Sequence, residues 1–305
     1  AEAATGFRRT ADLSEAPAVL QAWNTPTLQV LGTPPAELPD GMSLPGAKDP
    51  GPGQHVESDA LRDVLDELRL RKSEYEIDCL ANAITITTHA LTESAAAIAP
   101  GAWEYEPQGL LEGAFIRLGS ERPGFHSIVG SGPNSVTLHY EKNNRRMQDG
   151  ELLVMDVGAK WRYYTADVTR TFPVNGRFTP RQREVYQAVL DAQTAAFEAA
   201  RPGVTMHELD AVARALIDER GFGPGRKYFK HGLGHWIGLH VHDVGAYGPI
   251  EPGMLFTIEP GIYIAEENLG VRIEDDYLMT GSGAVKLSDG IPSDPDAIEA
   301  LMARA

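Results

Sequence analysis

HGLGHWIGLHVHD, residues 231–243, is the stretch around which the rest of the sequence can be interpreted. His231 and His235 lie four residues apart, a spacing that lets two imidazoles on one helix face bind a zinc ion. A helix is not expected here, because Gly232 and Gly234 lie between the pair and each glycine costs a helix interior about 1 kcal/mol. No glutamate stands next to His231 to act as a base. We therefore predict an extended, glycine-broken path that carries imidazoles into a functional site.

Four acidic residues lie in apolar, β-branched segments of the kind that form buried strands. They are Asp156 in LLVMDVGA, Asp167 in TADVTRTFPV, Glu259 in MLFTIEPGIYI and Glu274 in GVRIEDDYLM. Moving an ionised carboxylate into such low-dielectric surroundings is costly unless the carboxylate is paired with a cation or binds a metal. The sequence therefore predicts that something neutralises these acids.

Neighbouring basic side chains are too few to neutralise the acids. Arg170 and Arg272 are the only basic residues within the four segments. Two divalent ions would balance four carboxylates, and one neutral imidazole from residues 231–243 would complete a dinuclear site with shared acids and a bridging water. The residues thus favour a dinuclear metal centre.

The ordered set of motifs resembles that of the creatinase/aminopeptidase, or pita-bread, metallopeptidases. The motifs are the aspartates at 156 and 167, HGLGHWIGLHVHD, EPGMLFTIEPG and RIEDD. The resemblance runs from about Leu70 to the C-terminus. It implies an α+β pita-bread fold, in which two pseudo-symmetric αβ halves share a curved antiparallel sheet covered by helices.

The chain is expected to divide near residue 57. Residues 1–57 are interpreted as a reduced N-terminal segment and linker, because residues 33–54 are dense in proline and glycine. Residues 58–305 are expected to form the pita-bread catalytic domain. Proline-specific members of the family usually carry a full domain before the catalytic one, and residues 1–57 leave room only for a remnant.

A weak internal repeat supports the two-half architecture. APGAWEYEPQGLLEGAFIRLG, starting at Ala99, parallels RPGVTMHELDAVARALIDERG, starting at Arg201. Each copy has Pro-Gly, a spacer and an amphipathic helical pattern that ends at Gly119 or Gly221.

Other local patterns predict the remaining elements. Ser73 with Glu76, and Thr179 with Gln182, are capping boxes that begin two helices. SDALRDVLDEL, from Ser58, predicts a further helix with one buried apolar face. FHSIVGSG, SVTLHY, ELLVMDVGA and TADVTRTFPV are predicted as antiparallel strands whose inner face carries the acids.

The resemblance implies a role for each acid of the site. The implied metal ligands are Asp156, Asp167, His235, Glu259 and Glu274. Glu259 is also implied to take the proton from the attacking water.

Further residues are implied to act on the substrate. His231 and His242 are similar to family histidines that orient the scissile carbonyl and stabilise the oxyanion, and His139 to one that faces the substrate. Tyr263 and Arg272 flank ligands at alternating strand positions and are expected to face the substrate as well.

Within the family, the motifs most resemble the Xaa-Pro aminopeptidase branch, with prolidase next. The resemblance implies a metal-dependent aminopeptidase that hydrolyses the bond between an N-terminal residue and a following proline, using a metal-bridging water. An Xaa-Pro dipeptidase shares every ligand and stays open as an alternative. A non-catalytic pita-bread protein that binds peptides is a rival of another class. The oxygen-rich ligand set favours Mn2+, and Zn2+, Co2+ and Fe2+ also fit.

Composition limits the partners and the compartment. The net charge of −16 argues against nucleic acid, which needs a basic surface, and no apolar run approaches the ~20 residues of a membrane span. Cys79 is the only cysteine, so a cytoplasmic location is expected, with a removed signal peptide left open. The expected partners are a peptide with proline at its second position and a second copy of the chain in a homodimer.

Overall fold

The computed structural model describes residues 59–224 and 226–303. From Leu68 on, the described residues form one compact unit, to which the last residues of helix α3 (Asp59–Leu70) belong. The segment and linker expected over residues 1–57 lie outside the described residues.

Two helices begin at the predicted capping boxes. The Ser73 hydroxyl accepts a hydrogen bond from the backbone N–H of Glu76, and the Glu76 carboxylate accepts one from the backbone N–H of Ser73, at the start of α4 (Glu74–Ser94). Thr179 starts α6 (Pro180–Ala199) in the same way. Each box satisfies backbone donors that the first helical turn leaves unpaired. Both predicted helix starts are confirmed.

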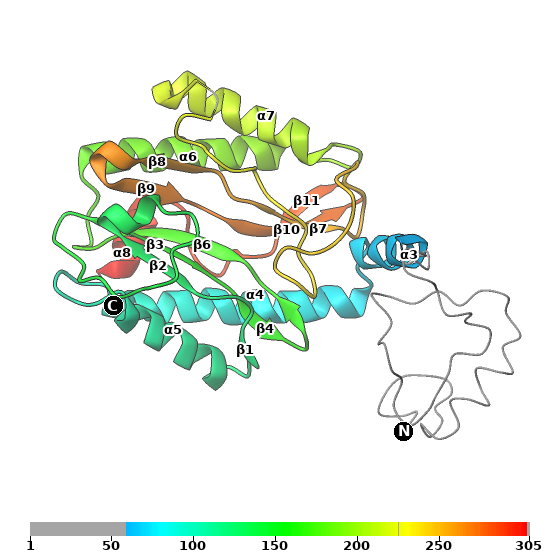
Figure 1. The fold of residues 1–305 in the computed structure, drawn as a ribbon, viewed down its shortest axis with the longest axis horizontal. Coiled ribbons are helices and arrows are strands. Elements are labelled where there is room, and N and C mark those ends of the chain that lie inside the picture. Colours follow the sequence, from blue (N-terminus) through cyan, green and yellow to red (C-terminus); the bar gives the residue numbers. More distant parts are fainter. Residues whose placement is uncertain (1–58, 225, 304–305) are drawn as a thin grey trace, which may run out of the picture. The chain divides into compact units, whose positions relative to one another are not determined.

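The two copies of the internal repeat, residues 99–119 and 201–221, each contain the second helix of a packed pair. Helix α4 packs against α5 (Tyr105–Arg117), and α6 packs against α7 (Met206–Ile217). Gly119 and Gly221 follow α5 and α7 with φ angles of +96° and +86°, a conformation that glycine adopts without steric cost. Figure 1 shows the two pairs on opposite sides of the strands.

The strands pair in four small groups among the described residues, β2-β3-β6, β11-β10-β7, β1-β4-β5 and β8-β9. Every pairing is antiparallel, as predicted. The strands are β1 (Arg122–Pro123), β2 (Ile128–Ser131), β3 (Leu152–Val157), β4 (Ala159–Trp161), β5 (Tyr164–Thr165), β6 (Val168–Pro173), β7 (Leu255–Ile258), β8 (Gly261–Ile264), β9 (Leu269–Arg272), β10 (Asp275–Thr280) and β11 (Gly283–Lys286). The remaining helices are η3 (Ala95–Ala97), η4 (Gly132–Val136), η5 (Asp218–Phe222), η6 (Ala265–Glu267) and α8 (Pro295–Met302).

The pairing register of the strands brings the acidic residues of the two halves of the chain together. Asp156 of β3 lies opposite Thr169 of β6. Thr169 in turn forms an isolated bridge with Glu274, which lies between β9 and β10. The first half of the chain therefore meets the second half at the residues that carry the acids.

The apolar core lies between the helix pairs and the strands. It includes Leu91 and Phe115 from the first helix pair, Val189 and Leu209 from the second, and Met155 from β3. Within residues 59–224 and 226–303, none of the helices combines the length and the apolar character that a membrane span requires.

Two local predictions are wrong. SVTLHY, residues 135–140, forms no strand; the 3-10 helix η4 occupies its start, where the Ser135 hydroxyl donates to the Gly132 carbonyl at 2.5 Å. Two residues of the apolar face expected on α3 are not buried, since Val64 and Leu68 are 56% and 66% exposed. In residues 135–140 and in α3, the spacing of apolar residues does not show which parts of the protein those residues would pack against.

Candidate metal centre

One cavity of about 320 Å³ collects the residues that the sequence singled out. Its lining consists of Leu138, His139, Asp156, Asp167, His231, Gly232, Gly234, His235, His242, Tyr247, Glu259, Arg272 and Glu274. All the predicted metal ligands are among them, as are all the residues predicted to contact substrate except Tyr263. Side chains from β3, the start of β6, the 231–243 stretch, the end of β7 and the β9–β10 junction thus share one site.

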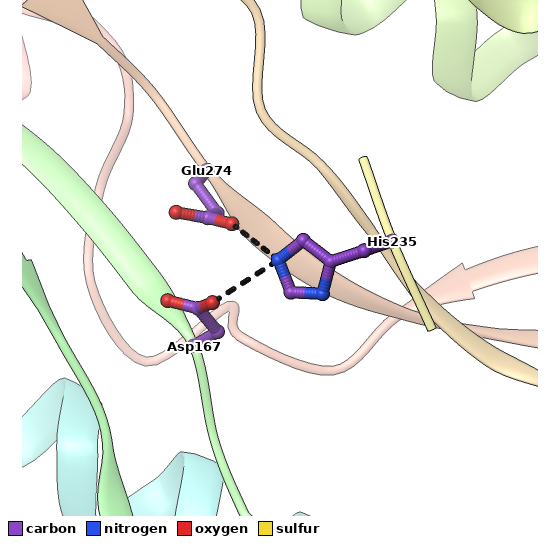
Figure 2. A group of neighbouring side chains, drawn as sticks. All are labelled: Asp167, His235 and Glu274. Carbon is purple, nitrogen blue, oxygen red and sulfur yellow. Dashed lines mark ion pairs between the residues drawn. The ribbon is translucent and has the colours of Figure 1, made fainter. Parts of the chain in front are cut away.

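The tightest group consists of Asp167, His235 and Glu274, whose candidate ligand atoms all lie within 4.8 Å of one another. His235 Nε2 is 3.3 Å from Asp167 Oδ2 and 3.9 Å from Glu274 Oε1, and Figure 2 shows this nitrogen facing both carboxylates. The other ring nitrogen, Nδ1, lies 3.1 Å from the Trp236 carbonyl. A hydrogen bond from Nδ1 leaves the lone pair of Nε2 directed at the acids.

Several carboxylate oxygens at this site accept no hydrogen bond from residues 59–224 and 226–303. Asp156 Oδ2 accepts a hydrogen bond from Arg272 Nη2 at 2.6 Å, but no described residue donates to Asp156 Oδ1. Asp167 Oδ1 and Glu274 Oε1 are likewise buried without a hydrogen-bond partner among the described residues. Unsatisfied buried oxygens are costly, and carboxylate oxygens with one imidazole nitrogen suit a divalent cation. The residues present therefore fit a metal.

The electrostatics of the cluster also favour a bound cation. Burial and the charge of Asp156 raise the pKa of Glu274 to about 8. Burial and the charge of Glu274 raise the pKa values of Asp167 and Glu259 well above their ordinary range. Burial lowers the pKa of His235 to about 4, so this imidazole is neutral near pH 7. Mutually repelling acids beside a neutral imidazole form a set that a divalent cation would stabilise.

A chain of hydrogen bonds holds His231 at the cavity. The Tyr263 hydroxyl accepts from Arg272 Nη1 at 2.9 Å and donates to His231 Nε2 at 2.8 Å. His231 Nδ1 then donates to the Gly232 carbonyl at 2.8 Å, which fixes the neutral tautomer. Burial and the charge of Arg272 lower the pKa of His231 to about 3. Tyr263 itself is fully buried, so it supports His231 from behind instead of facing the substrate directly.

The other two predicted substrate histidines lie on the open side of the cavity. The ring of His242 lies edge-on to that of His235, with centroids 4.2 Å apart. The ring of His139 is 6.5 Å from that of His242. Both His139 and His242 are exposed, so these rings are accessible to a ligand that enters the cavity.

Residues 231–243 contain no helix, as predicted; the path is extended over residues 233–237 and bends over residues 238–242. The stretch follows β7: the backbone N–H of Thr257 donates to the His235 carbonyl at 2.9 Å, and that of Glu259 donates to the Leu233 carbonyl at 2.7 Å. A Cβ on Gly234 would lie 2.0 Å from the Thr257 carbonyl oxygen. The glycine therefore permits the close approach that brings His235 and Glu259 to the same site.

Sequence reasoning missed three residues of the site. The Thr169 hydroxyl donates to Glu274 Oε2 at 2.7 Å; its position two residues after Asp167 was a usable signal, because alternate strand residues share a face. Tyr247 and Leu138 line the cavity, and Tyr247 stacks on Trp236 at 5.6 Å. No spacing in the sequence indicates those two positions.

Comparison with known proteins defines the family of the chain. Residues 78–281 match Metallopeptidase family M24, and the chain belongs to this family. The α+β pita-bread fold expected from the sequence is confirmed, as is the resemblance to this group.

Two curated relatives and one solved structure illustrate the similarity. The Xaa-Pro aminopeptidase of Escherichia coli is 40% identical over 272 residues, covering 80% of this chain and 62% of the relative. The Xaa-Pro dipeptidase of Pyrococcus furiosus is 40% identical over 231 residues, covering 74% and 65%. The zinc-substituted E. coli aminopeptidase P in complex with product has a TM-score of 0.76 at 39% identity, covering 80% and 62%. The chain thus spans less than two thirds of the length of these relatives.

Proposed function

We propose that this chain is a metal-dependent aminopeptidase that hydrolyses the bond between an N-terminal residue and a following proline. The observation that carries the proposal is the meeting of four acids and His235 in one cavity, with buried carboxylate oxygens that lack a hydrogen-bond partner among the described residues. Membership of the metallopeptidase family and the names of the E. coli relatives support it.

The ligand set would hold two divalent ions. The proposed ligands are Asp156, Asp167, His235, Glu259 and Glu274, and Mn2+ is the expected ion because oxygen donors predominate. When bound, such ions would act as Lewis acids and lower the pKa of water toward neutrality. The zinc-substituted E. coli structure supports a divalent metal in general and does not favour Mn2+ over the other ions.

Glu259 is the acid best placed to take a proton from the attacking water. Its carboxylate oxygens lie 3.6 Å from His231 Nδ1 and 3.6 Å from His235 Nε2, between the ligand group and the substrate-facing histidines. Its side chain is 17% exposed, against 11% for Asp156, 6% for Asp167 and 1% for Glu274. A water on the substrate side can therefore reach Glu259 more easily than the other acids.

The remaining residues would select and orient the peptide. The free amino group would be attracted to the acid cluster, and His242 would stabilise the oxyanion. His231 would orient the scissile carbonyl by donating to it the Nδ1–H that bonds the Gly232 carbonyl in the free protein. The proline nitrogen belongs to a tertiary amide without an N–H, so recognition depends on ring shape, which the exposed imidazoles of His139 and His242 can match. Arg272 pairs with Asp156 and bonds Tyr263, so it would hold this arrangement in place.

An Xaa-Pro dipeptidase is the second candidate, favoured by the similarity to the P. furiosus dipeptidase. A dipeptidase must bind the carboxylate that directly follows proline, whereas an aminopeptidase accepts a longer peptide. Rates on an Xaa-Pro dipeptide and an Xaa-Pro-Yaa tripeptide at equal Mn2+ loading separate the two. We expect the tripeptide to be cleaved faster.

The test of the proposed function is Glu259→Gln. We expect kcat on Xaa-Pro-Yaa to fall on the order of 10³-fold, because the amide cannot accept the water proton, while the circular dichroism spectrum stays unchanged. Glu121→Gln, at an exposed glutamate, is the matched control and should keep full activity. Retained activity in Glu259→Gln would contradict the role of Glu259. No cleavage by the unsubstituted protein with Mn2+, Zn2+ or Co2+ would favour the peptide-binding alternative.

A further inference from the structure

His139 enters the cavity from a segment without regular structure. Residues 137–145 contain no helix or strand. Among the described residues, the His139 side chain makes no hydrogen bond, and its only ring contact is with His242. Its position must therefore be set by the residues that precede and follow it in the chain.

Tyr140, the next residue, is attached to the fully buried carboxylate of Glu104 at the start of α5. Glu104 Oε2 accepts from the Tyr140 hydroxyl and from the backbone N–H of Arg145, both at 2.9 Å. Glu104 Oε1 accepts from the backbone N–H and the hydroxyl of Ser131, each at 2.7 Å, and from Asn134 Nδ2 at 3.0 Å. Both oxygens of this acid are thus saturated by protein donors, so it cannot serve as another metal ligand.

The same acid therefore joins three segments around His139. Ser131 ends β2, Tyr140 follows His139, and Arg145 lies near the far end of the loop. Asn143 adds a second attachment, since its Oδ1 accepts from the Val129 N–H at 3.0 Å and its Nδ2 donates to the Ser127 carbonyl at 2.7 Å. A carboxylate fixed by several donors is a rigid attachment point, and a loop held in this way is organised before the substrate binds.

We propose that Glu104 and Tyr140 are positioning residues that hold His139 against the proline ring of the substrate. The inference rests on the proposed proline specificity. Neither residue lines the cavity, so both would act only through the placement of His139.

A double-mutant cycle tests the proposal. Tyr140→Phe removes one hydroxyl and should lower kcat/KM on Xaa-Pro-Yaa on the order of tenfold, about 1.4 kcal/mol, through KM, with kcat within about twofold. In the His139→Ala background the same substitution should change kcat/KM by less than about twofold, because the residue being positioned is gone. Tyr105→Phe removes the hydroxyl of an exposed tyrosine at the same helix start and should have no effect. An equal loss in both backgrounds, or no loss with His139 present, would overturn the proposal.

Trypsin sensitivity gives a readout that does not depend on peptidase activity. Lys142 is exposed within the loop, and loosening the loop should speed cleavage after it by about threefold or more in Tyr140→Phe but not in Tyr105→Phe. If the unsubstituted protein cleaves no Xaa-Pro peptide, the proposed function fails while this measurement still decides the attachment. Faster cleavage then supports the role of Tyr140 in holding the loop, and an unchanged rate overturns it.

Discussion

Two buried arginine–aspartate pairs in this molecule have very different surroundings. Arg170 Nη2 lies 2.7 Å from Asp275 Oδ1, and Arg272 Nη2 lies 2.6 Å from Asp156 Oδ2. In the first pair both side chains are fully buried, whereas Arg272 and Asp156 retain 4% and 11% exposure at the cavity. By sequence alone, Arg170 and Arg272 are equivalent as cations near the acids.

Hydrogen bonding distinguishes the two pairs. Asp275 Oδ1 accepts from Arg170 and from the Ser288 hydroxyl, and its Oδ2 from Gln193 Nε2 and Lys286 Nζ, both at 3.0 Å. Asp156, in contrast, keeps one buried oxygen to which nothing in the described part of the chain donates a hydrogen bond. A buried acid saturated by protein donors serves the fold, while one left open in a cavity is available to a ligand.

The largest expected effect on activity comes from substituting an acid that has a buried oxygen without a hydrogen-bond partner among the described residues. Asp167→Asn should lower kcat/KM on the order of 10⁴-fold, about 5.4 kcal/mol, because a ligand and its charge are lost. The melting temperature of the metal-free protein should stay equal or rise, because one of several repelling carboxylates is gone. Steady-state kinetics with metal measures the change in kcat/KM, and thermal unfolding in the presence of a chelator measures the melting temperature. Wild-type activity, or a clear fall in metal-free stability, would show that Asp167 serves the fold and not a ligand.

A substitution in the Arg170–Asp275 pair tests the acid whose oxygens are all bonded within the protein. Asp275→Ala should lower the free energy of unfolding by about 3–5 kcal/mol, because the buried Arg170 guanidinium loses its countercharge. The loss should be the same with and without metal, as measured by urea unfolding. Asp289→Ala, at a site 81% exposed beside the same Lys286, is the matched control and should stay within about 0.5 kcal/mol. A loss for Asp275→Ala that appears only with metal would place Asp275 in the metal centre.

Metal addition sharpens the comparison without any substitution. Mn2+ at about 100 times its dissociation constant should raise the free energy of unfolding by about 2.7 kcal/mol, and a chelator should reverse the gain. Asp167→Asn should lose most of this stabilisation, while Asp289→Ala keeps it. Unfolding curves at two Mn2+ concentrations provide the measurement. Identical curves for the unsubstituted protein would show that the open oxygens do not bind Mn2+.

The smallest expected effect concerns the path that brings His235 to the acids. Gly234→Ala should destabilise the protein by about 1–3 kcal/mol, because its methyl group would overlap the Thr257 carbonyl oxygen. Gly232→Ala, two residues away, meets no heavy atom within 4 Å and should change stability by less than about 0.5 kcal/mol. Urea unfolding compares the two, and equal effects would show that the close approach to β7 is not what requires glycine.

The sequence was sufficient for the fold class, through the resemblance of its motifs to a known family, and for the group of acids. The capping residues, the repeat and the strand patterns around Asp156 and Asp167 depend on residues that are close in sequence, so they can be recognised without knowing the tertiary contacts. The structure brings the predicted ligands together, although their binding of metal stays a prediction. The 231–243 stretch was interpreted correctly as non-helical because Gly232 and Gly234 disfavour a helix.

Long-range contacts explain what the sequence could not provide. Tyr263 alternates with ligand positions and so was expected to face the substrate, but Arg272 and His231 bond its hydroxyl inside the protein. SVTLHY has the composition of a strand, yet Tyr140 and its neighbours are attached to Glu104, more than thirty residues earlier. His231 and Glu104 each lie more than thirty residues from the tyrosine that they bond, so no pattern within the segment could indicate them.

The division of the acids between the two halves sets an order of events during synthesis. Asp156 and Asp167 emerge from the ribosome with the first helix pair, but Glu274 follows more than a hundred residues later. A nascent chain that stops before Glu274 would contain only part of the centre, however well its first half had folded. Capture of a cation is therefore expected to come late, as a sign that both halves have joined.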